Sequence, residues 1–189
     1  MTTPGDLGYA FALSLPPGAD ARLRAWAEAT PGATWDESGS HVTLARLTGS
    51  VPPENLIPAF HEACARLKPF QAAFTLPLRE PYWDKPGLEI VMLAGETATD
   101  IAGVMALRDL LLAATESRGL VLFEPGDYRP HVTLTTGLPS QDALRLETAA
   151  GALNLRFTAE EVVYWCGGES PDAQTPADPP WYVVDRVLL

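Results

Sequence analysis

The same four-residue word, HVTL, occurs twice in this chain, at residues 41–44 and at residues 131–134. The two words begin at His41 and His131, and the whole chain has only three histidines. Each word lies in a segment where apolar and polar residues alternate, which is typical of a β-strand. Two equal strands so far apart in the sequence indicate that a structural unit has been duplicated.

The segments around the two words follow one another in the same order. Each half is predicted to contain a strand, a helix, the HVTL strand, a second helix and a further strand, over roughly 7–78 and 88–165, and 181–189 adds a closing strand. The predicted strands are 7–15, 40–47, 70–78, 88–94, 120–123, 130–136, 153–165 and 181–189; the predicted helices are 19–29, 55–67, 97–117 and 140–150. Residues 166–180 are predicted to form a polar, proline-rich surface loop. We therefore expect residues 1–189 to form a single domain with two similar lobes.

The charge balance narrows the possible partners. The chain has 13 Lys and Arg against 24 Asp and Glu, for a net charge of −11. Long nucleic-acid duplexes are held mainly by Lys and Arg that neutralise phosphates, so we do not expect such a partner. A small nucleotide or an RNA terminus in a local positive pocket remains compatible with this composition.

Location and assembly follow from what the sequence lacks. Its apolar runs are far shorter than the ~20 residues of a membrane span, and the N-terminus shows no signal-peptide pattern. We expect a soluble, cytoplasmic protein without membrane contact. Cys64 and Cys166 stand far apart and indicate neither a disulfide framework nor a zinc site. No coiled-coil pattern is present, so we expect a monomer.

Strand geometry places the polar residues of each word on one face. Residues two apart in a strand point to the same side, so His41 shares a face with Thr43, and His131 shares a face with Thr133. The valine and leucine of each word point to the other face, where a core can form. If the two units pack about a pseudo-two-fold axis, two imidazoles and two hydroxyls meet in one cleft.

This set of side chains is suited to phosphodiester chemistry. A neutral imidazole can take a proton from a nucleophile, and a protonated one can give a proton to a leaving oxygen. Threonine hydroxyls can donate hydrogen bonds to phosphate oxygens that bear negative charge in the transition state. Two related halves place the acid and the base on opposite sides of the phosphorus, as in-line attack requires.

Two H-x-T motifs on the strands of a duplicated lobe resemble the 2H phosphoesterase superfamily, which includes cyclic nucleotide phosphodiesterases and bacterial 2′-5′ RNA ligase-like proteins. The opening YAFALSLPP and the proline that precedes the second word are also similar to that family, and the resemblance covers about residues 7–189. It implies an α+β fold, bilobal, in which two antiparallel-rich sheets face a central cleft with helices on the outside.

The resemblance also implies a site and an activity. His41 and His131 would be catalytic, Thr43 and Thr133 would hold the phosphate, and no metal or cofactor would be needed. The usual chemistry is the opening of a 2′,3′-cyclic phosphate, or the making or breaking of a 2′-5′ phosphodiester, on nucleotides or RNA ends. The sequence leaves open which histidine is the acid, which direction is used, and which substrate and base are preferred.

Further residues are candidates for substrate binding. Arg129 precedes His131 by two and is expected on the same face, whereas Arg46 follows His41 by five and would face away in a regular strand. Four aromatic residues in or near predicted loops could stack on a base, or could cover the rim of the core: Trp35, Tyr82, Trp83 and Tyr128.

Other readings of the motifs stay open. The cleft could bind a nucleotide or RNA end without catalysing a reaction, in which case replacing a histidine would weaken binding only modestly. If the protein were a scaffold that binds partners, the histidines would be incidental, and the presence of two intact HVTL words would be a coincidence. A metal site at His41 and His131 lacks a further ligand at a suitable spacing, and His61, in a predicted helix, has no partner motif.

Overall fold

The computed structural model describes the chain except for residues 1–6, 35–38, 83–84, 117, 123–127 and 169–179. Most of the predicted surface loop therefore lies outside the described residues. The elements, in chain order, are β1 (Leu7–Ser14), α1 (Pro17–Ala29), β2 (His41–Gly49), a 3₁₀ turn (Pro53–Leu56), α2 (Ile57–Cys64), β3 (Phe70–Phe74), β4 (Leu76–Pro81), β5 (Leu88–Ala94), α3 (Ala98–Glu116), β6 (Val121–Leu122), β7 (His131–Pro139), α4 (Ser140–Ala150), β8 (Leu155–Ala159), β9 (Glu161–Gly168) and β10 (Tyr182–Leu188).

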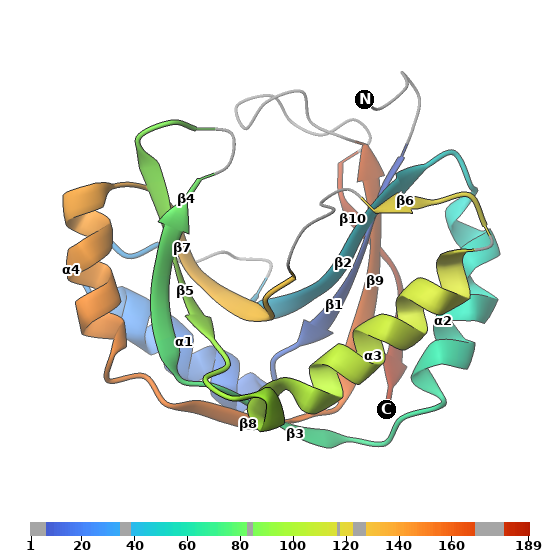
Figure 1. The fold of residues 1–189 in the computed structure, drawn as a ribbon, viewed down its shortest axis with the longest axis horizontal. Coiled ribbons are helices and arrows are strands. Elements are labelled where there is room, and N and C mark those ends of the chain that lie inside the picture. Colours follow the sequence, from blue (N-terminus) through green and yellow to red (C-terminus); the bar gives the residue numbers. More distant parts are fainter. Residues whose placement is uncertain (1–6, 35–38, 83–84, 117, 123–127, 169–179) are drawn as a thin grey trace.

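Most of the strands form one curved antiparallel sheet (Figure 1). Its order is β10-β9-β1-β2-β7-β5-β4, and β6 pairs with the far end of β2. The two HVTL strands, β2 and β7, meet through one described pair, Val42 with Val132. The α+β class with antiparallel sheets is as predicted, and this pair joins the strands β10-β9-β1-β2 to the strands β7-β5-β4 in one sheet.

Two predicted strands are each divided in the structure. The segment 70–78 breaks at Thr75 into β3 and β4, and the segment 153–165 breaks at Glu160 into β8 and β9. β3 pairs with β8 in a separate two-stranded sheet, whereas β4 and β9 belong to the large one. The sequence prediction missed these breaks because a single residue interrupts each apolar run, and the pairing partners are remote in sequence.

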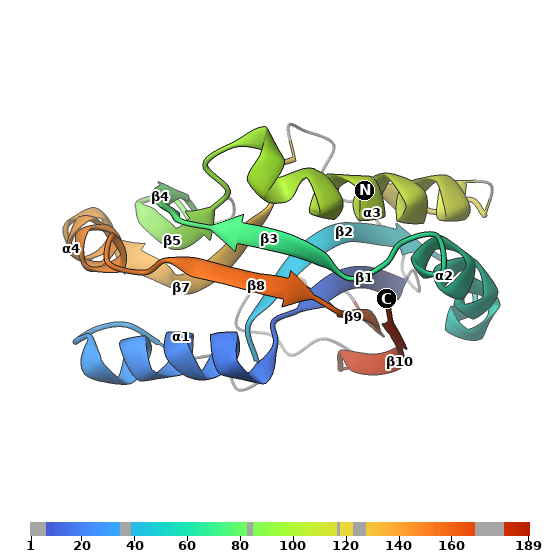
Figure 2. The same cartoon turned by 90° about the horizontal axis from the view of Figure 1, so that it is seen from below.

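The helices lie on both sides of the strand layer, with α1 and α3 on opposite sides (Figure 2). Although α3 follows β5, it packs against α2, β3 and β2. Although α1 follows β1, it lies beside β7 and contacts β8. Each half thus sends its first helix onto the other half, so the two halves are interlocked. No helix in the described part of the chain has the length and apolar character that a membrane span requires.

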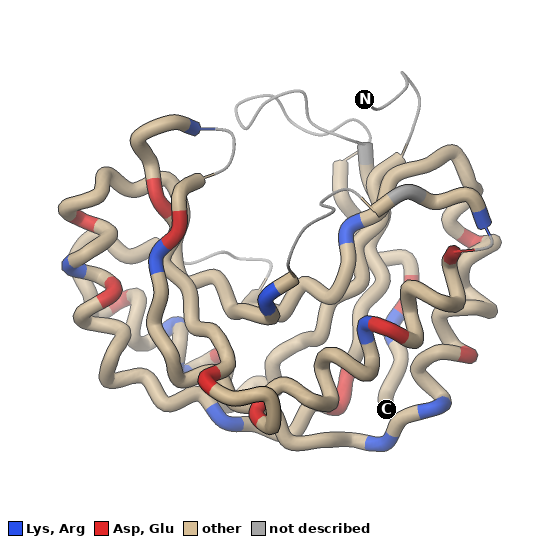
Figure 3. Tube along the Cα trace, in the orientation of Figure 1, with Lys and Arg blue, Asp and Glu red and all other residues tan. Residues whose placement is uncertain are grey.

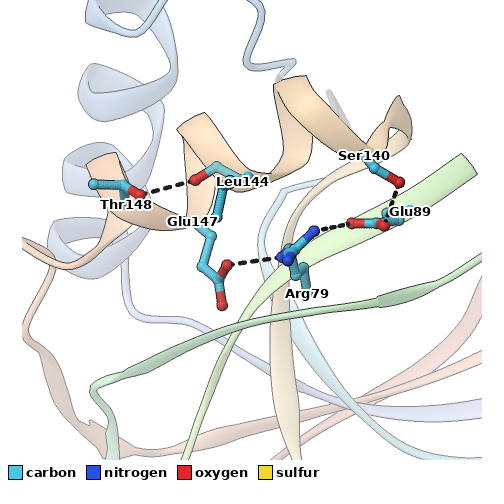
Figure 4. Close-up of polar contacts among 6 residues, drawn as sticks. All are labelled: Arg79, Glu89, Ser140, Leu144, Glu147 and Thr148. Atoms are coloured by element: carbon cyan, nitrogen blue, oxygen red, sulfur yellow. Dashed lines mark hydrogen bonds and ion pairs between the residues drawn. The ribbon is translucent and has the colours of Figure 1, made fainter.

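Helix α4 packs on the β4–β5 hairpin, and a polar cluster links them (Figure 4). Arg79 on β4 donates to Glu147 on α4 and to Glu89 on β5, and the Ser140 hydroxyl donates to Glu89. Ser140 is a natural capping residue for this helix by type, but the cap position is occupied by Pro139. The serine side chain instead ties the first turn of the helix to the hairpin.

Each HVTL strand carries a β-bulge at the leucine of its word. Between β1 and β2, the register jumps past Leu44, and between β5 and β7 it jumps past Leu134. A bulge places two residues opposite one and resets the alternation of the strand. Arg46, beyond the first bulge, therefore borders the same cavity as Thr43, whereas in a regular strand it would face away.

Candidate active site

The single pairing between β2 and β7 gathers the polar side chains of both words. Because the pair is antiparallel and centred on the two valines, His41 lies across from Thr133, and Thr43 lies across from His131. Residues that face each other in such a pair have Cβ atoms about 5 Å apart, and diagonal neighbours are roughly 7–8 Å apart. The valines are fully buried, whereas none of the four polar residues is. Two imidazoles thus lie on one diagonal of the surface, and two hydroxyls on the other.

The backbone holds both imidazole rings in the same way. Nδ1 of His41 lies 3.2 Å from the Gly39 carbonyl oxygen, and Nδ1 of His131 lies 2.9 Å from the Arg129 carbonyl oxygen. A carbonyl oxygen only accepts hydrogen bonds, so each Nδ1 carries the proton and donates. Nε2 of each ring is then left to accept a proton when the ring is neutral, or to donate one when the ring is charged.

The segment that precedes His41 is fixed by helix α1. The backbone N–H of Ser40 donates to Oδ1 of Asp20, at 2.8 Å. On the same side of the site, the hydroxyls of Thr34 and Thr135 share a hydrogen bond of 2.8 Å. One contact joins helix α1 to the residue before β2, and the other joins the segment between α1 and β2 to β7, so the surroundings of His41 include elements from both halves.

Between its pairings with β7 and with β6, strand β2 has an edge that no described strand covers. Tyr128 lies there and donates its hydroxyl to the Thr43 carbonyl oxygen, at 2.8 Å. The Arg108 guanidinium lies over the tyrosine ring, with Cζ 4.2 Å from the ring centroid. Burial raises the pKa of Tyr128 well above its usual value, and the nearby Arg108 charge opposes this only in part. The phenol therefore stays protonated and remains a donor.

Two adjacent cavities open at the surface of the motifs. The larger has a volume of about 990 Å³ and is bordered by Thr43, His131 and Thr133. The smaller has a volume of about 110 Å³, lies against α1, and is bordered by His41 and Thr133. Because Thr133 borders both, a phosphate at this residue would have space on either side, with one histidine facing each space.

Some of the predicted binding residues border the larger cavity, and others lie outside the described residues. Tyr82, Tyr128, Arg46 and Arg129 all border the larger cavity. Nη1 of Arg129 is paired with Glu80 at 2.9 Å. The remaining two, Trp35 and Trp83, lie outside the described residues.

Among the lining residues of the larger cavity that sequence reasoning missed are Arg108 and Thr136. Arg108 lies between Val104 and Leu111 on α3, at helical spacing from both, and both are fully buried. An arginine beside the apolar stripe of a helix was therefore the available signal. Thr136 follows His131 by five, as Arg46 follows His41. This equal offset is visible in the sequence, but only the bulges bring both residues to the cavity side of their strands.

In the part of the chain that the structure describes, no group of three or more His, Cys, Asp or Glu side chains is arranged to hold a metal ion. The third histidine, His61, lies away from the motifs and pairs with Asp185, its Nε2 2.6 Å from Oδ2. Cys64 is fully buried, and burial raises the pKa of its thiol to about 12, so it remains a thiol. Neither group adds a nucleophile or a ligand to the site.

Comparison with known proteins gives one family and several similar folds. The sequence model of the 2′-5′ RNA ligase superfamily matches residues 15–168. No curated protein sequence matches this chain significantly. Similar solved structures include Escherichia coli LigT in complex with 3′-AMP (17% identity, 98% of each chain covered, TM-score 0.59) and the TT0787 protein of Thermus thermophilus (19% identity, 96% of this chain and 97% of that chain, TM-score 0.58). A structure described as a phosphoesterase is 18% identical over 96% of this chain and 98% of its own, with a TM-score of 0.60. At these identities the structural likeness shows a shared fold.

Proposed function

Because this chain belongs to the 2′-5′ RNA ligase superfamily, we propose that it is a metal-independent phosphoesterase that uses His41 and His131 as a paired acid and base. The observation that carries the proposal is the matched pair of imidazoles. Each is held through Nδ1 by the backbone carbonyl two residues before it, beside the threonine of the other word. An incidental pair of surface histidines would have no reason to share this arrangement.

The reaction that fits this arrangement is the opening of a 2′,3′-cyclic phosphate. The oxygen of a water molecule attacks the phosphorus while Nε2 of one histidine takes its proton. The bond from phosphorus to one ribose oxygen breaks, and Nε2 of the other histidine protonates that oxygen. The products are a phosphomonoester and a free hydroxyl. Thr43 and Thr133 donate hydrogen bonds to the non-bridging oxygens, where negative charge is borne. The same groups can act on a 2′-5′ phosphodiester, in either direction.

The larger cavity favours a nucleotide or an RNA end as the substrate. Its volume of about 990 Å³ lies at the upper end of the range typical of small-ligand sites, so it has room for a nucleoside beside the phosphate. Escherichia coli LigT, which shares the fold, has been solved in complex with 3′-AMP, ATP and NADP+. The net charge of −11 disfavours a long duplex.

The test is turnover of the four nucleoside 2′,3′-cyclic phosphates, and of a 2′-5′-linked dinucleotide, in the presence of EDTA. We expect His41→Ala and His131→Ala each to lower kcat/KM by roughly 10²-fold or more, the usual contribution of a positioned acid or base. His61→Ala is the matched control and should leave turnover unchanged. If the wild type binds these nucleotides but converts none of them, the protein is a binding module and the catalytic proposal fails.

A further inference from the structure

We infer that Arg46 and Arg108 form a subsite for a second phosphate, so that the substrate is a nucleotide or RNA end with a 5′-phosphate as well as the reacting 2′,3′-phosphate. This inference rests on the proposed function, which it deepens. It is carried by two arginines from different elements that border the same cavity as Thr43.

Arg108 has unused hydrogen-bonding capacity next to the site. Its Nε is buried and has no hydrogen-bond partner among the described residues. Its guanidinium is stacked on the Tyr128 ring, and the hydroxyl of that ring contacts the Thr43 carbonyl at 2.8 Å. Stacking occupies the flat face of a guanidinium and leaves its N–H groups, which lie in the plane, able to bind an anion. Arg108 thus borders the larger cavity and is linked to Thr43 through a single residue, Tyr128.

Arg46 borders the same cavity from strand β2. The bulge at Leu44 returns it to the cavity face three residues after Thr43. Three residues of extended chain span at most about 10 Å, so the arginine lies beyond the reacting phosphate but close to it. An arginine binds a phosphate with two parallel hydrogen bonds, which suits a terminal phosphate group.

The distribution of charge supports an anion at this end of the cavity. The cavity is bordered by Arg46, Arg108 and Arg129 and by Glu80 and Glu96, so its charged lining is net positive in a chain of net charge −11. Figure 3 shows basic positions on β2, on α3 and just before β7, the segments that supply these arginines. Arg129 and Glu80 offset each other by direct pairing, and the rest of the charged lining still carries more positive than negative charge.

The inference predicts a preference that can be measured. The assay compares kcat/KM for adenosine 2′,3′-cyclic phosphate with a free 5′-hydroxyl and with a 5′-phosphate. We expect the wild type to favour the 5′-phosphorylated form by about 10-fold or more, the value of one charge-assisted hydrogen bond. In Arg46→Gln and in Arg108→Gln this ratio should fall toward one. Arg66→Gln, which removes an exposed arginine near the end of α2 that pairs with Glu62, is the control and should keep the wild-type ratio.

A second measurement separates this inference from the proposed function. Calorimetric binding of adenosine 3′,5′-bisphosphate and of 3′-AMP gives the same comparison without turnover, and thermal melting confirms that each variant is folded. If neither cyclic phosphate is converted but the bisphosphate binds about 10-fold more tightly, and loses this advantage in both variants, the subsite stands and the catalytic proposal fails. A wild-type ratio near one, or a ratio that both variants retain, overturns the subsite.

Discussion

The hydrogen bond from Tyr128 to the Thr43 carbonyl is a single contact on which the geometry of the site depends. It lies on the edge of β2 that no described strand covers, at the point where β2 and β7 part. There the tyrosine hydroxyl supplies the donor that a neighbouring strand would otherwise give to the carbonyl of Thr43. We therefore expect the tyrosine to position Thr43 at an edge of β2 that no described strand covers.

Replacing this tyrosine should affect activity more than stability. Tyr128→Phe removes the donor, and we expect the free energy of unfolding to fall by about 1 kcal/mol, the typical value of one hydrogen bond. Turnover should fall by roughly 10-fold, because small misplacements of catalytic groups are costly. The control is Tyr164→Phe, which removes a hydroxyl that donates to the Pro53 carbonyl at 3.2 Å. Denaturant titration should show a similar loss of unfolding free energy in Tyr164→Phe, with turnover unchanged. Equal turnover in the two variants would contradict the positioning role.

The pair of His61 and Asp185 gives a prediction for acid stability. The hydrogen bond from His61 holds the pKa of Asp185 below its usual value of 3.8. The stabilisation is therefore present above that value and is lost as the pH falls through the lower, folded-state pKa. We expect Asp185→Asn to be less stable than the wild type by about 0.5 kcal/mol at pH 6, since the pair is partly exposed.

The difference between wild type and Asp185→Asn should shrink below about pH 4, when followed by denaturant titration at successive pH values. The control is Asp142→Asn, whose carboxylate lies 3.5 Å from Arg145 in a pair that is half exposed, and for which we expect a smaller effect under the same neutral conditions. A difference that grows as the pH falls would contradict the assignment.

At the scale of elements, the outer helix α4 is held by the polar cluster of Figure 4 in addition to its apolar face. Arg79 bridges two carboxylates on different elements, with its nitrogens 3.0 Å from Glu147 and 3.1 Å from Glu89. The pKa of Glu89 is lowered first by the hydrogen bond from Ser140 and further by Arg79, so the carboxylate is charged at neutral pH. The cluster joins three elements that are separate in the sequence.

Removing the arginine should loosen α4 without affecting the motifs. We expect Arg79→Ala to lower the free energy of unfolding by about 1 kcal/mol, because two pairs in one network are lost together. Amide hydrogen exchange should rise in residues 140–150 more than in β2 or β7. Arg24→Ala, which removes a single exposed i,i+4 pair with Glu28, should cost less than about 0.5 kcal/mol. Equal losses of unfolding free energy in the two variants would show that the network adds no stability beyond that of a single exposed pair.

For the whole molecule, the pair of Val42 and Val132 is the point at which the two halves of the large sheet meet. Both side chains are fully buried, and they lie directly behind the histidines and threonines. The site is thus assembled at a junction between halves rather than inside either one. Its geometry depends on the register of one strand pair and on the helices that cross between the halves.

A small cavity behind this junction should disturb the site selectively. Val132→Ala should lower the free energy of unfolding by about 2 kcal/mol through lost burial and the space left behind, and it should lower turnover because the two words lose their alignment. Val162→Ala removes an equally buried valine from β9 and should cost similar stability while retaining turnover. If both variants retained full turnover, the junction would have no part in alignment.

Local patterns were enough to predict much of this architecture. The four helices occupy the predicted regions, because the apolar spacing that marks a helix repeats within one turn of chain. The family resemblance read from the two words is confirmed by the superfamily match. The shared face of each histidine and its threonine also follows from the two-residue period of a strand, which needs no partner to be known.

Other features depended on contacts between distant segments. The breaks at Thr75 and Glu160, the bulges that turn Arg46 and Thr136 toward the cavity, and the convergence of Arg108 with Tyr128 are not encoded in any local period. A bulge or a change of sheet is selected by the strand that lies alongside, and that strand comes from elsewhere in the chain. The sequence by itself therefore determined which side chains each HVTL strand presents, and only the tertiary structure decided which further residues join them, because strand pairing and helix crossing are properties of the folded whole.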